Sequence, residues 1–171
     1  NNIGISYYDK GDYEEALSYF TSSLKIREEL GDKRGMGSSL NNIGTFYNAQ
    51  GDYEKALDNI KRSFDIREEI GDKYGVGSCL AVIGNIYFQQ DYYKKAKDYF
   101  EKALANKEEI GVGIDDKIAA TVYLYLTNKI LGKKYDEKEI HTLIKNAENI
   151  DFGINRRLYE LLEDTSYLET A

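Results

Sequence analysis

Apolar and small residues recur along the chain with the spacing of one face of an α-helix. Between residues 40 and 64, a first set occupies positions i, i+3, i+4 and i+7: Leu40, Ile43, Gly44 and Tyr47. After a short break, a second set repeats the helical spacing: Tyr53, Ala56, Leu57, Ile60 and Phe64. The pattern predicts two amphipathic helices, of which the first ends near Gln50 and the second near Ile70.

Glycine and aspartate mark the boundaries of these helices. The run Gln50-Gly51-Asp52 interrupts the apolar pattern, and the Asp52 carboxylate can accept from the free backbone amides that begin a helix. Gly71 suits the left-handed conformation that ends a helix, and Asp72 can cap the next one. The sequence therefore predicts an all-α chain of antiparallel hairpins, each with a helix A and a helix B joined by tight turns.

This hairpin recurs with a period of 40 residues. Residues 1–40 and 41–80 are identical at 23 of 40 positions without a gap, and residues 81–120 match the second copy at 12 of 40. Such a period is typical of repeats that stack into an α-solenoid. The expected single domain over 1–171 contains repeat 1 (1–40, with a truncated helix A), repeat 2 (41–80), repeat 3 (81–120), a degenerate repeat 4 (121–150) and a capping helix (151–171).

Small residues lie where the two helices of each hairpin should cross. Gly44 is inside helix A at a cost of about 1 kcal/mol relative to alanine, and Gly4 and Gly84 hold the same place in their repeats. In helix B, Ala16 and Ala56 recur in the same way. Because small side chains let helix axes approach closely, we expect these positions to set the packing of each hairpin.

These residues resemble the signature of the tetratricopeptide repeat. In the second copy the resemblance is carried by Leu40, Ile43-Gly44, Tyr47, Ala56, Ile60 and Ser63. The usual period is about 34 residues, and here Glu28, Glu68 and Glu108 replace the proline that ends helix B. The longer repeat is similar to those of Pins-type scaffolds, kinesin light chain and bacterial signalling proteins. The resemblance implies a right-handed superhelix whose A helices line a concave groove.

Residues after 120 fit the repeat less well. We expect an A-like helix over 116–131, with Leu124 in the place of the helix A glycine, and a B-like helix over 136–149. A last amphipathic helix over 155–162 would cover the open end of the stack. Its segment 156–162 resembles the link from such arrays to an output domain in bacterial signalling proteins. Since Asn1 matches the mid-helix Asn41 and no initiator methionine is present, we expect a fragment of a longer protein.

In the tetratricopeptide fold, helix A residues on either side of the conserved glycine face the groove. The resemblance implies a peptide-binding groove lined by Asn2, Ser38, Asn41, Asn42, Thr45, Asn48, Ser78, Val82, Asn85, Phe88, Gln89 and Tyr125, with Ile5, Ala49, Thr121, Val122 and Asn128 beside them. Chaperone-binding members carry lysine and arginine in this groove. The matching positions here are uncharged, so we do not expect a receptor for chaperone tails.

Asparagine is frequent in the expected A helices, although its amide competes for backbone hydrogen bonds and disfavours mid-helix positions. An amide offers both a donor and an acceptor, which suits contact with the backbone of an extended peptide. The segment Leu40-Asn41-Asn42-Ile43 is similar to a peptide-binding helix of kinesin light chain. The alternative is that the amides bond neighbouring helices and hold the repeat spacing. Phe88 and Tyr125 are likewise either apolar anchors for a ligand or packing residues under the next helix.

Composition argues against several classes of function. The net charge is −7 with no basic cluster, so we do not expect nucleic acid as a ligand. No apolar run reaches membrane-spanning length, and no membrane association is expected. The single cysteine, Cys79, fits a reducing compartment. The sequence therefore predicts a cytoplasmic protein.

No motif for catalysis, a cofactor or a metal is recognisable. His141 has no second histidine or cysteine at ligand spacing, and we expect a surface or packing role for it. Cys79 has no nearby histidine and is expected to be a small buried residue. The glycine pairs of 35–37, 75–77 and 111–113 follow no strand and lack the lysine of phosphate loops, so we interpret them as turn punctuation.

The Arg-Glu-Glu runs at 27–29 and 67–69 are interpreted as solvated faces. Together these features predict a non-enzymatic scaffold that binds a peptide or helix of a partner protein in its groove. One alternative is a regulatory or sensor module of a larger signalling protein with an attached cyclase, kinase or transcription domain. The chain is expected to be a monomer or to associate end to end with a second copy.

Overall fold

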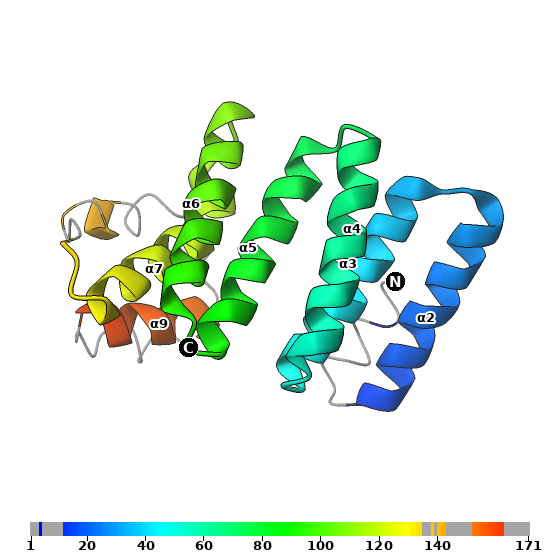
Figure 1. The fold of residues 1–171 in the computed structure, drawn as a ribbon, viewed down its shortest axis with the longest axis horizontal. Coiled ribbons are helices and arrows are strands. Elements are labelled where there is room, and N and C mark those ends of the chain that lie inside the picture. Colours follow the sequence, from blue (N-terminus) through cyan, green and yellow to red (C-terminus); the bar gives the residue numbers. More distant parts are fainter. Residues whose placement is uncertain (1–3, 5–11, 135–137, 139, 143–151, 163–171) are drawn as a thin grey trace.

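The computed structural model describes residues 4, 12–134, 138, 140–142 and 152–162, and in this part the regular structure is helical (Figure 1). The helices follow one another across the molecule, with α2 at one end and α7 and α9 at the other. Their bounds are α2 (Tyr13–Leu30), α3 (Lys33–Ala49), α4 (Tyr53–Glu69), α5 (Lys73–Gln89), α6 (Tyr93–Glu109), α7 (Ile114–Ile130) and α9 (Phe152–Leu162).

The predicted hairpins of repeats 2 and 3 are confirmed. Helices α3 and α4 contact each other more extensively than either contacts the next hairpin, and the same holds for α5 and α6. The Asp52 side chain accepts a hydrogen bond from the Lys55 amide over 3.2 Å, and Asp72 accepts from the Gly75 amide over 3.0 Å. Gly71 has the expected left-handed backbone, with φ at 68°. These caps explain why α4 and α5 begin, and α4 ends, where the sequence indicates.

The last helices differ in detail from expectation. The A-like helix predicted over 116–131 is α7, which begins and ends slightly earlier, and the helix predicted over 155–162 is α9, which begins at Phe152. Of the B-like helix expected over 136–149, only 138 and 140–142 lie within the described residues, and they are helical. Ile140 is buried among α6, α7 and α9.

The crossing of helices A and B depends on the repeated glycine. A Cβ added at Gly44 would lie 2.6 Å from Cδ1 of Ile60 and 3.1 Å from the carbonyl oxygen of Ala56. The same construction places a Cβ at Gly4 at 2.6 Å from the Phe20 ring and a Cβ at Gly84 at 2.8 Å from the Phe100 ring. Each glycine therefore receives a large side chain from helix B in place of its own side chain, as the spacing predicted.

Arg27 and Arg67 each connect a helix B to the next helix A. The interpretation of the Arg-Glu-Glu runs as solvated faces is therefore wrong for the two arginines. Arg67 donates to Asp72 Oδ2 over 2.8 Å and to Ser63 Oγ over 3.2 Å, and its side chain is 12% exposed. Arg27 donates to the carbonyl oxygen of Gly35 over 2.6 Å and to Ser39 Oγ. The glutamates that follow each arginine are exposed. We call Arg27 and Arg67 the junction arginines.

The glycine pairs of helices α3 and α5 are also not turn residues. Gly35 and Gly37 lie inside α3, Gly75 and Gly77 lie inside α5, and all four are buried. A Cβ at Gly75 would lie 1.7 Å from Nη1 of Arg67. These glycines leave room for side chains of the B helices, and sequence spacing alone could not distinguish this role from a turn. In the third glycine pair, at 111–113, Gly111 does occupy a turn, with φ at 70°.

Helix α9 covers one end of the stack. Leu158 and Leu161 are 0% and 1% exposed, and they join a core cluster with Phe100 and Leu126. Lys129 of α7 donates to the carbonyl oxygen of Leu161 over 2.9 Å, which stabilises the end of α9. The segment that resembles a link to an output domain therefore packs against α7.

Replacing Gly44 by leucine should separate α3 from α4. Overpacking of a core contact costs about 1–3 kcal/mol, and here the side chain would meet both Ile60 and the α4 backbone. We expect a lower and less cooperative thermal transition by circular dichroism. Ala49→Leu, at an exposed position of the same helix, is the control, and an unchanged Gly44→Leu melting curve would contradict this packing.

Replacing Arg67 by methionine should destabilise the junction between repeats 2 and 3. Charge-assisted hydrogen bonds contribute about 1.5–3 kcal/mol when partly buried, so we expect a loss of about 2 kcal/mol in urea unfolding. Arg62→Met is the matched control, because the Arg62 side chain is half exposed and its ion pair with Glu28 is long, at 3.9 Å. Its expected cost is under about 1 kcal/mol, and equal costs for the two variants would refute a special role for the junction arginines.

Candidate peptide-binding groove

A hollow of about 260 Å³ lies between the A helices α3, α5 and α7. We call it the groove pocket, and it is lined by Thr45, Asn48, Ala81, Val82, Asn85, Phe100, Ala119, Ala120 and Tyr123. None of these described residues carries a charge. Apolar atoms form most of its wall, while the polar side chains are Thr45 and Asn48 of α3, Asn85 of α5 and Tyr123 of α7. The arrangement can accept an apolar side chain and offer hydrogen bonds beside it.

Two asparagines bridge neighbouring A helices within this lining. Asn48 Nδ2 donates to Asn85 Oδ1 over 3.0 Å, so these amides hold α3 and α5 together as the packing alternative predicted. Asn48 Oδ1 is buried and accepts no hydrogen bond from the described residues. A buried acceptor without a donor costs about 1–3 kcal/mol. A ligand N–H group that reached this oxygen would therefore gain a hydrogen bond for which the protein has already removed water from the acceptor.

Tyr123 forms a firmly held wall of the groove pocket. Its ring stacks on Phe100 with centroids 5.6 Å apart, and it meets Phe88 edge to face at 5.4 Å. The guanidinium of Arg157, from α9, lies 5.6 Å from the Tyr123 centroid, and Arg157 Nε donates to the Tyr123 hydroxyl over 3.4 Å. Helix α9 therefore helps to position a groove residue.

The structure brings together four of the sequence-predicted groove residues: Thr45, Asn48, Val82 and Asn85. Sequence reasoning missed five others: Ala81, Phe100, Ala119, Ala120 and Tyr123. The lining residues of α7 follow those of α5 by 38 positions, although the sequence period is 40. Leu124 occupies the place of Gly84, and Val112 replaces the capping Asp72, so neither the glycine contact nor the cap fixes α7 in the register of the other A helices.

The other predicted groove residues that the structure describes are not part of the groove pocket. Ser38 and Ser78 are half-buried and donate to carbonyl oxygens of their own helices, those of Arg34 and Tyr74. Asn41 Oδ1 faces the Cys79 thiol at 3.9 Å. Asn42 is half-buried, and Ala49 and Gln89 are exposed. Asn2 and Ile5 lie outside the described residues.

The aromatic candidates of the C-terminal half take part in packing. Phe88 is 8% exposed and contacts Tyr93 and Tyr123 edge to face at 5.4 Å. Tyr125 is half-buried against the core cluster that contains Phe88, Leu126 and Leu158. Thr121 and Val122 are buried as well. These positions fit the alternative in which the residues pack under the following helix.

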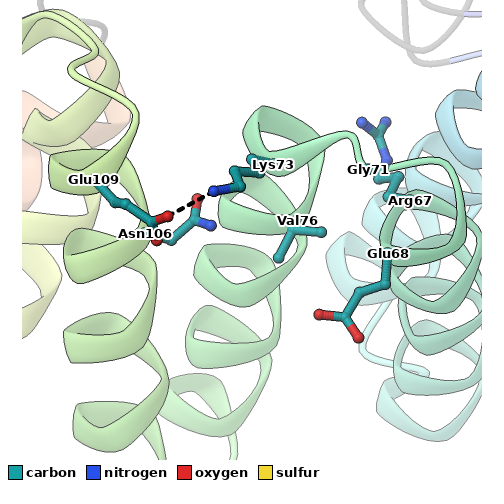
Figure 2. Close-up of a pocket in the computed structure, with 7 residues that line it drawn as sticks. All are labelled: Arg67, Glu68, Gly71, Lys73, Val76, Asn106 and Glu109. Atoms are coloured by element: carbon teal, nitrogen blue, oxygen red, sulfur yellow. Dashed lines mark hydrogen bonds and ion pairs between the residues drawn. The ribbon is translucent and has the colours of Figure 1, made fainter.

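A second hollow, of about 430 Å³, lies between the ends of α4 and α6 at the first turn of α5 (Figure 2). It is lined by Arg67, Glu68, Gly71, Lys73, Val76, Asn106 and Glu109. Its cations are already paired, because Arg67 binds Asp72 and Lys73 donates to Glu109 over 2.6 Å. The hollow is therefore a junction between repeats, and the two cations of its described lining are occupied by carboxylates of the protein itself.

Cys79 is fully buried, as expected, and lies 3.4 Å from Ser63 Oγ. Burial raises the pKa of the thiol, although the hydrogen bond with Ser63 opposes this effect. The thiol is thus protonated and inaccessible at neutral pH. His141 is exposed, as a surface role requires.

The part of the chain that the structure describes holds no group of three histidine, cysteine or acidic side chains able to bind a metal ion. Among the same residues, no helix combines the length and the apolar character needed to cross a bilayer.

The stacked hairpins and the groove along their A helices define a helical-repeat protein. A tetratricopeptide-repeat family model matches residues 35–109, and a second tetratricopeptide-repeat model matches residues 1–30. The chain belongs to the tetratricopeptide-repeat family.

Solved structures share the same architecture. A kinesin-light-chain-like protein of Podosopora anserina with nearly identical TPR-like repeats superposes with a TM-score of 0.68, covering 99% of this chain and 85% of that one at 12% identity. A point variant of that protein gives the same TM-score and identity, with 84% of its chain covered. At this identity the likeness concerns the fold. No curated protein sequence matches the chain.

Replacing Asn85 by alanine should loosen the contact between α3 and α5, because Asn48 Nδ2 would lose its acceptor. We expect a loss of about 1 kcal/mol in chemical denaturation. Gln89→Ala, at an exposed position of the same helix, should change stability by less than about 0.5 kcal/mol. Equal stability of wild type and Asn85→Ala would show that the amide bridge does not hold the helices.

Proposed function

We propose that the groove along α3, α5 and α7 binds an extended or helical segment of a partner protein, with one apolar side chain inserted in the groove pocket. Tetratricopeptide repeats generally mediate protein–protein interactions, and proteins of this family are typically scaffolds without catalytic activity. The observation that carries the proposal is the groove pocket itself, an apolar hollow on the A helices with amide groups at one side.

The size and lining of the groove pocket favour a side chain as its occupant. Its volume of about 260 Å³ is below the range of about 300–1,000 Å³ that is usual for small-molecule sites. Its walls of alanine, valine and aromatic rings suit an aliphatic residue such as leucine, isoleucine or methionine. Full burial of such a residue contributes about 1.5–3 kcal/mol, which makes it an effective anchor for a peptide.

The amides give the bound segment a direction and a register. Asn48 Oδ1 is a buried acceptor without a donor among the described residues, and a backbone N–H next to the anchor residue is a suitable partner. Since the described residues that line the groove pocket are uncharged, recognition would rest on apolar contact and neutral hydrogen bonds. We therefore expect binding to depend only weakly on salt.

Filling the groove pocket should abolish anchoring while leaving the fold intact. Ala119 lines the pocket and is exposed, so Ala119→Trp can occupy the space without entering the core. For peptides selected from a random library on the wild-type chain, we expect a loss of affinity of about ten- to a hundredfold by fluorescence anisotropy.

Ala105→Trp is the matched control, because Ala105 is an exposed alanine on the helix B α6. This variant should bind the selected peptides like the wild type, and both variants should melt like the wild type. Peptides that bind Ala119→Trp as tightly as the wild type would refute the groove pocket as the anchor site.

A further inference from the structure

The turn between α5 and α6 departs from the pattern of the turns at the same place in the earlier repeats. Those turns, at 11–15 and 51–55, have the sequences GDYEE and GDYEK, whereas residues 91–95 have the sequence DYYKK. Aspartate, tyrosine and lysine thus replace the glycine, the capping aspartate and the glutamate of the pattern. We call residues 91–95 the basic turn.

Each of the three replacements is unfavourable for the local structure. Asp91 has a left-handed backbone, with φ at 61°, where the equivalent Gly51 adopts this conformation without strain. Tyr92 gives the first turn of α6 no side-chain cap. Lys94 and Lys95 lie in that first turn, where the helix dipole favours negative charge. Departures from local rules that occur together are expected at functional surfaces.

A hollow of about 380 Å³ lies at the basic turn. Its lining consists of Asp91, Tyr92, Tyr93, Lys94, Lys95 and Leu131. Since Leu131 directly follows α7, the hollow lies between the start of α6 and the end of α7. Apolar atoms form most of its wall, and the Tyr92 side chain is 55% exposed. The hollow therefore suits an apolar side chain that has charged neighbours.

The replacement of the capping aspartate leaves a lysine without a carboxylate partner. In repeat 2, the Lys55 ammonium pairs with Asp52 over 2.7 Å. One period later, the Lys95 ammonium lies instead 5.1 Å from the ring centroid of Tyr87 and 5.4 Å from that of Tyr92. Within the described residues, Lys95 forms no ion pair. The two rings restrict its position, so less side-chain entropy is lost when it binds an anion.

The charge around the hollow favours a short acidic ligand. Its lining contains two lysines and one aspartate, and the Asp91 carboxylate accepts a hydrogen bond from the Tyr93 hydroxyl over 2.6 Å. Lys133 and Lys134 follow Leu131 in the chain and are exposed. The net charge of the whole chain is −7, which repels a long polyanion such as nucleic acid. A short acidic segment contacts only the positive region.

We propose that the basic turn and Leu131 form a docking surface for an acidic segment of a partner protein. An aromatic or aliphatic side chain of this segment enters the hollow beside Tyr92 and Leu131, and carboxylates on either side of it pair with Lys94 and Lys95. The hollow shares no lining residue with the groove pocket. The inference therefore does not depend on the proposed peptide binding in the groove.

The test measures the fluorescence anisotropy of labelled peptides of about twelve residues, each with a central leucine, phenylalanine or tyrosine flanked by glutamates, by serines or by lysines. We expect the glutamate peptides to bind at least about tenfold more tightly than the serine peptides. An increase in NaCl from about 0.05 to 0.5 M should weaken them about tenfold, unlike ligands of the groove pocket. Ala119→Trp, which fills the groove pocket, should leave their affinity unchanged.

The decisive variant combines Asp91→Gly, Tyr92→Asp and Lys94→Glu, which gives the basic turn the sequence of residues 51–55. The glycine and the capping aspartate both suit the local backbone, so this variant should melt at or above the wild-type temperature. We expect its affinity for the glutamate peptides to fall at least about tenfold. Lys61→Glu, at an exposed position of α4, lowers the net charge by the same two units. This matched control should bind like the wild type.

Two results would overturn the proposal directly: wild-type affinity in the variant with the replaced turn, or no preference of the wild type for glutamate over serine peptides. A single-stranded oligonucleotide and phosphatidylserine vesicles are measured in parallel. If either binds more tightly than the glutamate peptides and is released by Lys94→Glu, the surface belongs to another class of partner, and the proposal is likewise overturned.

Discussion

The close approach of helix A to helix B at a single glycine is the constraint on which the stack depends. Gly44 accepts the Ile60 side chain where its own Cβ would be, and Gly84 accepts the Phe100 ring in the same way. The large residue fills the space that the glycine leaves, so the two helices pack without a void. The hairpin then acts as a unit, and the junction arginines join successive units through the turn and the first residues of the next helix A.

Where this constraint is absent, the array changes. Leu124 stands in the place of the glycine. Ser63 and Asp72, which bind Arg67, are replaced one period later by Ala103 and Val112. Helix α7 accordingly presents a different register to the groove. It is covered by α9, whose Arg157 reaches Tyr123. The helix in which repeat identity is lost thus contributes one wall of the groove pocket and also carries α9 on its surface.

The fold could be predicted almost completely from local signals, because the caps at Asp52 and Asp72 and the repeated apolar spacing determine each hairpin without distant information. The groove could be predicted in part, since Thr45, Asn48, Val82 and Asn85 follow from the repeat register. Ala119, Ala120 and Tyr123 could not, because their place depends on how α7 turns after the regular repeats end. The burial of Arg67 was missed for a related reason: only the folded junction shows that glycines in the next helix make room for its side chain.

The central claim is that the groove pocket anchors a partner segment. The most direct measurement is the amide chemical-shift map of the isotopically labelled chain titrated with a peptide selected on it. The account predicts that the largest changes cluster at Asn48, Ala81, Ala119 and Tyr123 and leave the exposed faces of α4 and α6 unchanged. Changes concentrated on those outer faces, with none in the groove pocket, would contradict it.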